Sequence, residues 1–244
     1  MQHPDPFPGE AVCPALAPSS QGRPIELLYV DEHVVVANKP SGLLVHRGWD
    51  NDDDVAMFRV RDAIGAYVYP LHRLDRGTSG ALLFARGADA LRAWQAALDG
   101  GRRFYLALVR GQVKAGFEVD HALDDERGVR RDARSLVEPV WARAEPRCSL
   151  VRVEPMQGRT HQVRRHCAFA SHHVLGDANY GKGPLNREYR ARFGLARLAL
   201  HAARLVVTDP ATGAPVEVAS PLPDDLAGPI ARILAGEEIP PPDR

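Results

Sequence analysis

Hydrophobic and polar positions along the chain follow mainly the two-residue period of β-strands. The runs Ile25–Val30 and His33–Asn38 are rich in branched residues and flank Asp31-Glu32, a pattern that predicts a hairpin. Further strands are predicted where apolar runs end in Gly, Pro or Asp: Gly80–Ala85, Arg103–Val109, Ser149–Val153, Leu198–Thr208 and Val216–Ala219.

Helical spacing is less common. It predicts a helix over Ala88–Leu98, ended by Gly100-Gly101, and a second over Thr160–Ala170, which Gly158 or Thr160 could cap. Because many strands are interrupted irregularly by a few helices, the order favours an α+β fold with a mixed sheet over regular βαβ winding.

The two ends of the chain lack such patterns. Residues 1–24 hold six prolines without an apolar period, and residues 235–244 end in three consecutive prolines before Asp243-Arg244. Such composition predicts flexible tails around one folded domain at 25–234. No apolar run approaches the roughly 18 to 20 residues of a membrane span, and the N-terminus lacks the features of a secretory signal. We therefore expect no membrane partner and a cytoplasmic location.

Composition limits the possible functions. The three cysteines, Cys13, Cys148 and Cys167, form no C-x-x-C pair, which argues against a disulfide scaffold and a zinc ribbon. The formal net charge is zero, which lowers the expectation of a nucleic-acid partner unless the basic residues cluster. Only three of the 31 basic residues are lysines. Arginine suits phosphate recognition, although a compositional bias explains the same count.

One carboxylate lies among cations and hydroxyls, immediately before a predicted strand. Asp75 is flanked by Arg73 and Arg76 and followed by Thr78 and Ser79. Nearby positive charges favour the ionised carboxylate, which could act as a nucleophile or base. The alternative is a turn in which Asp75 accepts hydrogen bonds from Thr78 or Ser79 and pairs with a neighbouring arginine. As an isolated pattern, the turn is the favoured interpretation.

A second cluster, Gln157–His166, contains three arginines, two histidines and no acid. On the predicted helix, His161 shares a face with Arg164 and Arg165, and a helix N-terminus attracts phosphate. The cluster is therefore either an RNA-binding surface or a solvated basic face. Metal binding is disfavoured, because two histidines five residues apart diverge on a helix.

Three further segments are open to two interpretations. Five arginines against one acid in Arg187–Arg204 either extend a basic surface or form an ordinary surface segment. The acidic runs at 50–54 and 124–126 are expected to be solvated loops rather than magnesium ligands. Tyr105, on a predicted strand beside basic and aromatic residues, could stack on a base or move a proton, or could be a core aromatic.

The order and spacing of these segments resemble the RluA family of pseudouridine synthases across residues 25–220. His72-Arg73-Leu74-Asp75-Arg76-Gly77-Thr78-Ser79-Gly80 resembles the family's H-R-L-D-x-x-T-S-G signature. Three more segments are similar to family motifs in the same order: Gly158–His166, Gly176–Gly181 and Arg197–Ala202.

The resemblance implies a mixed, mainly antiparallel sheet with flanking helices and a central cleft, RNA as the partner, no organic cofactor and no required metal. Asp75 would attack the target sugar or abstract its proton. Tyr105 would contact the base and remove its C5 proton, in a segment where Arg103 replaces the family's lysine. Arg164 would pair with Asp75 and keep it ionised.

The remaining site residues concern RNA binding. Arg73 would help displace the target uridine from its stack, a step that costs a few kcal/mol. Leu200 would pack beneath the site. We also expect contacts to RNA from the other basic residues of the two clusters, and we expect the protein to be a monomer. These basic residues are Arg76, Arg159, His161 and Arg165.

Within the family, Lys39–Arg47 and Phe193–Leu195 look most like the members that modify uridine 65 of tRNA. The segments at 171–173 and 118–140 depart from the family pattern, so ribosomal RNA is an alternative substrate. An RNA-binding module without catalysis is a further alternative, which intact Asp75, Tyr105 and Arg164 argue against. A glycoside hydrolase would need a second carboxylate partner, and the sequence offers no convincing one.

Overall fold

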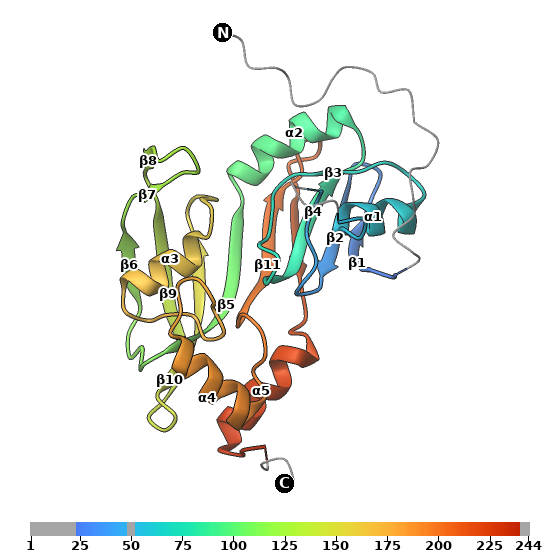
Figure 1. Cartoon of the computed structure of the whole chain (residues 1–244). Coiled ribbons are helices and arrows are strands. Elements are labelled where there is room, and N and C mark those ends of the chain that lie inside the picture. Colours follow the sequence, from blue (N-terminus) through green and yellow to red (C-terminus); the bar gives the residue numbers. More distant parts are fainter. Residues whose placement is uncertain (1–22, 48–51, 240–244) are drawn as a thin grey trace.

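The computed structural model describes residues 23–47 and 52–239 (Figure 1). Its strands and helices account for most of that chain. The strands are β1 (Glu26–Val30), β2 (Val34–Lys39), β3 (Tyr69–Pro70), β4 (Ser79–Ala85), β5 (Arg102–Arg110), β6 (Phe117–Asp120), β7 (Leu123–Asp124), β8 (Arg130–Arg131), β9 (Arg134–Arg143), β10 (Cys148–Pro155), β11 (Leu200–Thr208) and β12 (Pro215–Ala219). The helices are α1 (Ala56–Ile64), α2 (Ala88–Asp99), α3 (Gln162–Phe169), α4 (Gly183–Phe193) and α5 (Asp224–Ala235).

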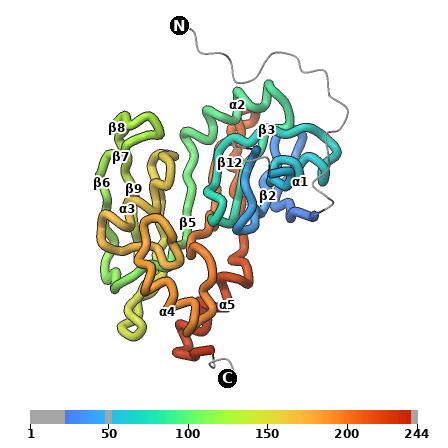
Figure 2. Tube along the Cα trace, viewed as in Figure 1, coloured from blue at the N-terminus to red at the C-terminus, as the bar shows by residue number. Residues whose placement is uncertain are grey.

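Strand β11 joins the two halves of one large sheet. The strand order is β1-β2-β4-β11-β5-β10-β9-β6, with β12 beside β11 and β3 beside β4. Among the described strands, β4 and β11 form the one parallel pair, and every other pairing is antiparallel. Figure 2 shows the orange trace of β11 running between the turquoise of β4 and the green of β5. The predicted α+β fold with a mainly antiparallel sheet is confirmed.

Strand β4 is buried on both faces. Its side chains alternate between two apolar clusters, as the two-residue strand period requires. Leu82 and Phe84 belong to the cluster that contains residues of α1, whereas Leu83 and Ala85 belong to the cluster that contains Trp94 of α2. The two helices therefore cover opposite faces of this half of the sheet, which contains β4, the strand that the predicted signature enters at Ser79.

The other half of the sheet carries three helices. Their buried side chains pack on β5 and β10 in a single large cluster, and Figure 1 shows α4 and α5 side by side at one end of the molecule. The helical members of this cluster are Val163, Cys167, Tyr189, Phe193, Leu226, Ile230 and Ile233. None of the helices in the described ranges is long and apolar enough to cross a membrane.

The strands and the helix expected from spacing are present. The hairpin pairs β1 with β2, and α2 ends at Asp99 with Gly100 as its C-cap. The second predicted helix begins later than expected. Neither Gly158 nor Thr160 caps α3, because His161 occupies the N-cap position with a left-handed φ of 56°. The segment Arg187–Arg204, interpreted as surface chain, forms most of α4 and then enters β11.

The structure describes part of the predicted C-terminal tail but almost none of the predicted N-terminal tail. Residues 1–22 and 240–244 lie outside the described residues. Within the predicted C-terminal tail, Ala235 ends α5, Glu238 pairs with Arg192 at 2.8 Å, and the Ile239 N–H donates to the Arg192 carbonyl at 2.7 Å. The folded part therefore extends beyond the boundary expected at residue 235.

Gly80 provides a test of the junction between the two halves. Its φ is +118°, and a Cβ there would lie 2.2 Å from the Ala202 carbonyl oxygen of β11. Gly213 also has a positive φ, of +70°, but has open space around it. We predict that Gly80→Ala lowers the free energy of unfolding by about 3 kcal/mol, through backbone strain and collision. Gly213→Ala should cost only about 1 kcal/mol, through strain alone. Urea unfolding of both variants measures the difference, and equal losses would contradict a close β4–β11 approach.

Candidate active site

The loop between β3 and β4, residues 71–78, carries Asp75 to the junction of the two halves. His72 anchors this loop, because its Nε2 accepts a hydrogen bond from the Leu83 N–H at 3.1 Å. Burial lowers the pKa of His72 to about 3, so the ring is neutral. The Arg76 carbonyl accepts hydrogen bonds from the Gly42 N–H at 2.7 Å and from Lys39 Nζ at 3.3 Å. The backbone on both sides of Asp75 is therefore fixed.

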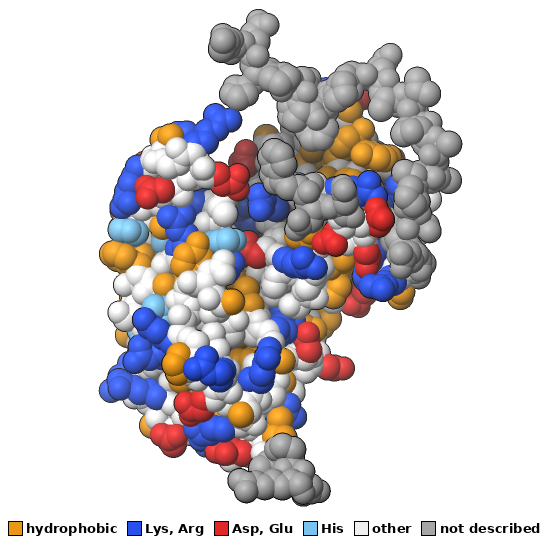
Figure 3. All heavy atoms as spheres, viewed as in Figure 1, with side chains coloured by type: hydrophobic (Ala, Val, Ile, Leu, Met, Phe, Trp, Pro, Cys, Tyr) orange, Lys and Arg blue, Asp and Glu red, His pale blue; other side chains and the backbone are white. Residues whose placement is uncertain are grey.

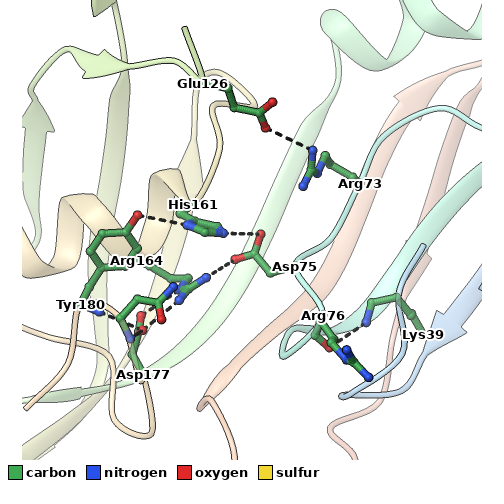
Figure 4. A network of polar contacts seen from close by, with 10 residues as sticks. Lys39, Arg73, Asp75, Arg76, Glu126, His161, Arg164, Asp177 and Tyr180 are labelled. Carbon is green, nitrogen blue, oxygen red and sulfur yellow. Dashed lines mark hydrogen bonds and ion pairs between the residues drawn. The ribbon is translucent and has the colours of Figure 1, made fainter. Parts of the chain in front are cut away.

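The carboxylate of Asp75 faces α3. Its Oδ2 accepts a hydrogen bond from Arg164 Nη1 at 2.9 Å, and its Oδ1 lies 3.6 Å from His161 Nε2 (Figure 4). Arg164 therefore makes the ion pair that the family resemblance implies. The side chain of Asp75 is 19% exposed. One oxygen edge is thus held by the protein while the group stays open to a ligand.

The two arginines that flank Asp75 in the sequence make no hydrogen bond or ion pair with its carboxylate in the described part of the chain. Arg73 lies 3.4 Å from Glu126, and Arg76 lies 3.7 Å from Asp52 and donates to the Gly42 carbonyl. The expectation that these two arginines hold the Asp75 carboxylate between them is therefore wrong. The turn interpretation is also wrong for the side chain. Ser79 Oγ contacts Arg197 and His201, and the Thr78 N–H donates to the backbone carbonyl of Asp75 rather than to its carboxylate.

Asp177 holds Arg164 in place. Arg164 Nε and Nη2 donate to the two oxygens of Asp177 at 2.8 and 2.9 Å, and both side chains are buried. Burial opposes the charge of Asp177, but hydrogen bonds from Arg164 and from the N–H groups of Tyr180 and Asn179 outweigh it and lower its pKa. Burial also opposes the charge of Arg164, and its bonds to Asp177 and Asp75 raise its pKa. The pair remains ionised at neutral pH.

His161 meets Asp75 from the turn before α3. Its Nδ1 lies 3.1 Å from the Tyr180 hydroxyl, and its left-handed φ is uncommon for a residue with a Cβ. Burial lowers the pKa of His161, although Asp75 partly opposes this effect. The expectation of one shared helical face is wrong, since Arg165 turns away and donates to the Asp124 carbonyl at 2.9 Å.

A cavity of about 510 Å³ opens on one side of Asp75. Tyr105 and Leu200 line it on adjacent strands, and Arg73 and Arg159 line it from the surrounding loops. Burial raises the pKa of Tyr105, so its phenol is neutral at pH 7. Figure 3 shows this face hollowed between the two halves of the sheet, with Lys and Arg side chains along the hollow.

Two polar groups in this cavity were not recognised from the sequence as site residues. Thr78 Oγ1 and Arg103 Nε are buried without a hydrogen-bond partner among the described residues, and both residues line the cavity. Buried polar atoms are normally paired, so these two unsatisfied groups are unusual. The substitution of Arg103 for the family's lysine was the one signal that could have drawn attention to it.

A second cavity, of about 690 Å³, shares Asp75, His161 and Arg164 with the first. Arg76 lines it, whereas Arg165 lines neither of these two cavities. The described residues contain no group of three or more His, Cys, Asp or Glu side chains that could hold a metal ion. The side chains that surround the two hollows include the Asp75 carboxylate, the Tyr105 phenol and several arginines.

A buried polar chain fixes the strand beside the site. Arg197 Nη2 donates to Ser79 Oγ at 2.7 Å, and Ser79 Oγ lies 2.9 Å from His201 Nδ1. His201 Nε2 lies 3.1 Å from the Ser220 carbonyl, which can only accept, so Nε2 carries the proton and Nδ1 accepts from Ser79. These motif residues hold β4, β11 and β12 together.

Comparison with known proteins places these motifs in one family. The sequence profile described as RNA pseudouridylate synthase matches residues 33–169. A relative from Yersinia pestis named tRNA pseudouridine synthase C is 40% identical over 213 residues, which cover 78% of this chain and 83% of the relative. A relative of the same name from Salmonella typhimurium is 38% identical over 216 residues, with coverage of 79% and 83%.

Solved structures share the fold. Human RNA Pseudouridylate Synthase Domain Containing 4 matches with a TM-score of 0.69 and 22% identity, over 86% of this chain and 93% of that one. Human RNA Pseudouridylate Synthase Domain Containing 1 matches with a TM-score of 0.67 and 23% identity, over 94% and 100%.

The role of Asp177 as the anchor of Arg164 can be measured. We predict that Asp177→Asn lowers the free energy of unfolding by about 3 kcal/mol at pH 7, because it leaves a buried guanidinium short of a charge partner. The control Asp225→Asn removes the 58%-exposed partner of Arg197 and should cost less than about 1 kcal/mol.

The pH dependence of the free energy of unfolding gives a second test of the Asp177→Asn variant. The folded pKa of Asp177 lies below its ordinary value of 3.8, so its contribution is present above that pH and is lost as the pH falls through the folded pKa. The difference between wild type and Asp177→Asn should therefore shrink in acid. Equal losses for both variants at pH 7 would refute the anchoring role.

Proposed function

The chain belongs to the RNA pseudouridylate synthase family, and we propose that it converts uridine to pseudouridine in tRNA with Asp75 as the reacting carboxylate. The observation that carries this proposal is the position of Asp75. Its carboxylate is paired with Arg164 at 2.9 Å and lies where two cavities meet. The resemblance assigns the reacting role to the same residue.

The reaction is an isomerisation in which no atom is gained or lost overall. The C1′–N1 bond breaks with its electron pair passing to the base, after Asp75 attacks the sugar or removes a sugar proton. The detached base turns, and its C5 forms a bond to C1′ while the Asp75–C1′ bond breaks or, on the other route, while Asp75 returns the proton to the sugar. C5 then loses its proton and N1 gains one, so the product has the composition of the substrate. No cofactor is needed for this balance.

The first cavity is proposed to hold the target base. Tyr105 would lie against the base and accept its C5 proton. Since the phenol is neutral at pH 7, it can accept that proton only as it passes its own to another group. Leu200 is buried at the cavity wall and would support the base from below. Leu200 makes only apolar contact with the base in this proposal, so the position of the reacting sugar is set by the Asp75 carboxylate.

The basic residues would contact different parts of the RNA, according to where they lie around the two cavities. Arg73 is 62% exposed at the rim of both cavities, a place suited to displacing the uridine from its stack. Arg159 and Arg76 would contact RNA at the two cavities, and His161 would position the substrate beside Asp75. Arg165, directed away from the cavities, would meet RNA at a more distant point.

Transfer RNA is the proposed substrate because the relatives named above are tRNA pseudouridine synthases. Uridine 65 is the proposed position, from the resemblance of the Lys39–Arg47 and Phe193–Leu195 segments. We propose that the enzyme acts in the cytoplasm as a monomer. Ribosomal RNA is the alternative substrate for the same chemistry. An RNA-binding module without catalysis is disfavoured by the intact Asp75–Arg164 pair.

We predict that Asp75→Asn abolishes tritium release from RNA labelled at C5 of uridine while RNA binding persists. The neutral amide can neither attack the sugar nor take its proton. Asp89→Asn makes the same change at a carboxylate that is 97% exposed on α2, and it should release tritium at the wild-type rate. Retained turnover by Asp75→Asn would exclude Asp75 as the reacting group, and inactivity of both variants would point to damage unrelated to the site.

The substrate can be tested separately from the chemistry. Incubation of wild type with unmodified tRNA and with ribosomal RNA, followed by mapping of pseudouridine, should show modification at tRNA position 65. The Asp75→Asn protein should produce none. Modification of ribosomal RNA with every tRNA left unchanged would rule out the tRNA assignment and leave the proposed chemistry intact.

A further inference from the structure

The second cavity extends from Asp75 toward α4 and has a strongly basic lining. Five arginines line it against two carboxylates, Asp75 and Asp177. It shares Arg73, Leu74, Asp75, His161 and Arg164 with the cavity proposed for the base. The two hollows are therefore adjacent, with the reacting carboxylate in the wall between them.

Most of the lining cations are already used within the protein. Arg164 is bound by Asp75 and Asp177, and Arg197 pairs with Asp225 at 2.8 Å while donating to Ser79. Exposed acids lie near Arg73 and Arg76, at 3.4 and 3.7 Å. These four guanidinium groups therefore supply little uncompensated charge.

Arg190 differs from these four residues. Its Nη2 donates to the Ala196 carbonyl at 2.9 Å, and no ion pair links Arg190 to an acid of the described residues. The residue lies in the last turn of α4, where buried Tyr189 and Phe193 hold the helix against the core. A rigid helix thus presents an exposed, unneutralised guanidinium at the mouth of the cavity.

We propose that the second cavity binds the phosphate backbone of the RNA strand beside the target uridine, with Arg190 contacting a phosphate. This inference rests on the proposed function, since it needs RNA with its target base in the first cavity. A planar guanidinium binds phosphate oxygens through two parallel N–H groups, and such contacts fix the register of the strand without reading its sequence. His46 and Asn179, exposed on the same lining, offer further polar contacts to the strand.

Continuity of the strand favours RNA over a small anion. A uridine turned into the first cavity remains covalently joined to its neighbours, so their phosphates must leave past Asp75. In this proposal the second cavity receives these phosphates. Arg190 balances their negative charge, because the other four arginines of the lining are already paired with acids of the protein. The RNA would therefore span both hollows, with the base in one and the backbone in the other.

The same helix provides a matched control. Arg187 precedes Arg190 by three residues and is likewise exposed, but it does not line the cavity. We predict that Arg190→Gln weakens binding of unmodified tRNA by about three- to tenfold and reduces the salt slope by about 1, because one phosphate contact is lost. KM should rise with kcat nearly unchanged. Arg187→Gln should stay within about twofold of wild type in affinity.

Filter binding of the full-length protein to a tRNA transcript, at several salt concentrations, measures both effects. Arg190→Lys keeps the charge and should retain most of the affinity, whereas a role limited to the Ala196 carbonyl would show instead as a lower unfolding midpoint. Equal affinities for the Arg190→Gln and Arg187→Gln proteins would overturn the proposal. Wild type that neither binds nor modifies tRNA would refute the proposed substrate and this inference together, while wild-type turnover with equal variants would refute this inference alone.

Discussion

Two carboxylates share one guanidinium at the centre of this molecule, and the geometry of the site depends on that arrangement. Asp177 takes two of the donors of Arg164 and leaves Nη1 for Asp75. Asp177 is buried and also accepts hydrogen bonds from backbone N–H groups. If Arg164 turned away, this buried carboxylate would lose its charge partner, which is costly. The reacting carboxylate is thereby aimed from outside its own loop.

Strand spacing was sufficient to predict much of the sheet. The branched runs around Asp31-Glu32 and the apolar run of β5 are where expected, because burial of these strands imposes the two-residue period on the sequence. Helix α5 was missed because Gly228-Pro229, normally a turn signal, lies inside it. Helix α4 was missed because it buries only Tyr189 and Phe193, which leaves a weak apolar period.

The site shows what proximity in sequence cannot establish. Arg73 and Arg76 flank Asp75 along the chain, yet the loop directs their side chains to Glu126 and Asp52 instead. Arg164, 89 residues away, makes the contact, and before the structure only the family resemblance pointed to it. Asp177 was inside a quoted motif but had no assigned role, although it is the one acid of that segment. The tertiary fold, which no local pattern encodes, decides these partners.

The position of β11 has a consequence for how the enzyme is made. Residues 200–208 lie between β4 and β5, so most of the chain must be synthesised before the strand that separates these two is available. Synthesis proceeds from the N-terminus, and long-range strand pairing is slow to form. Until β11 emerges from the ribosome, Asp75 and Arg164 lack the frame that brings them together. Assembly of the site is therefore expected late in synthesis, once residues 200–208 can pair with both neighbouring strands.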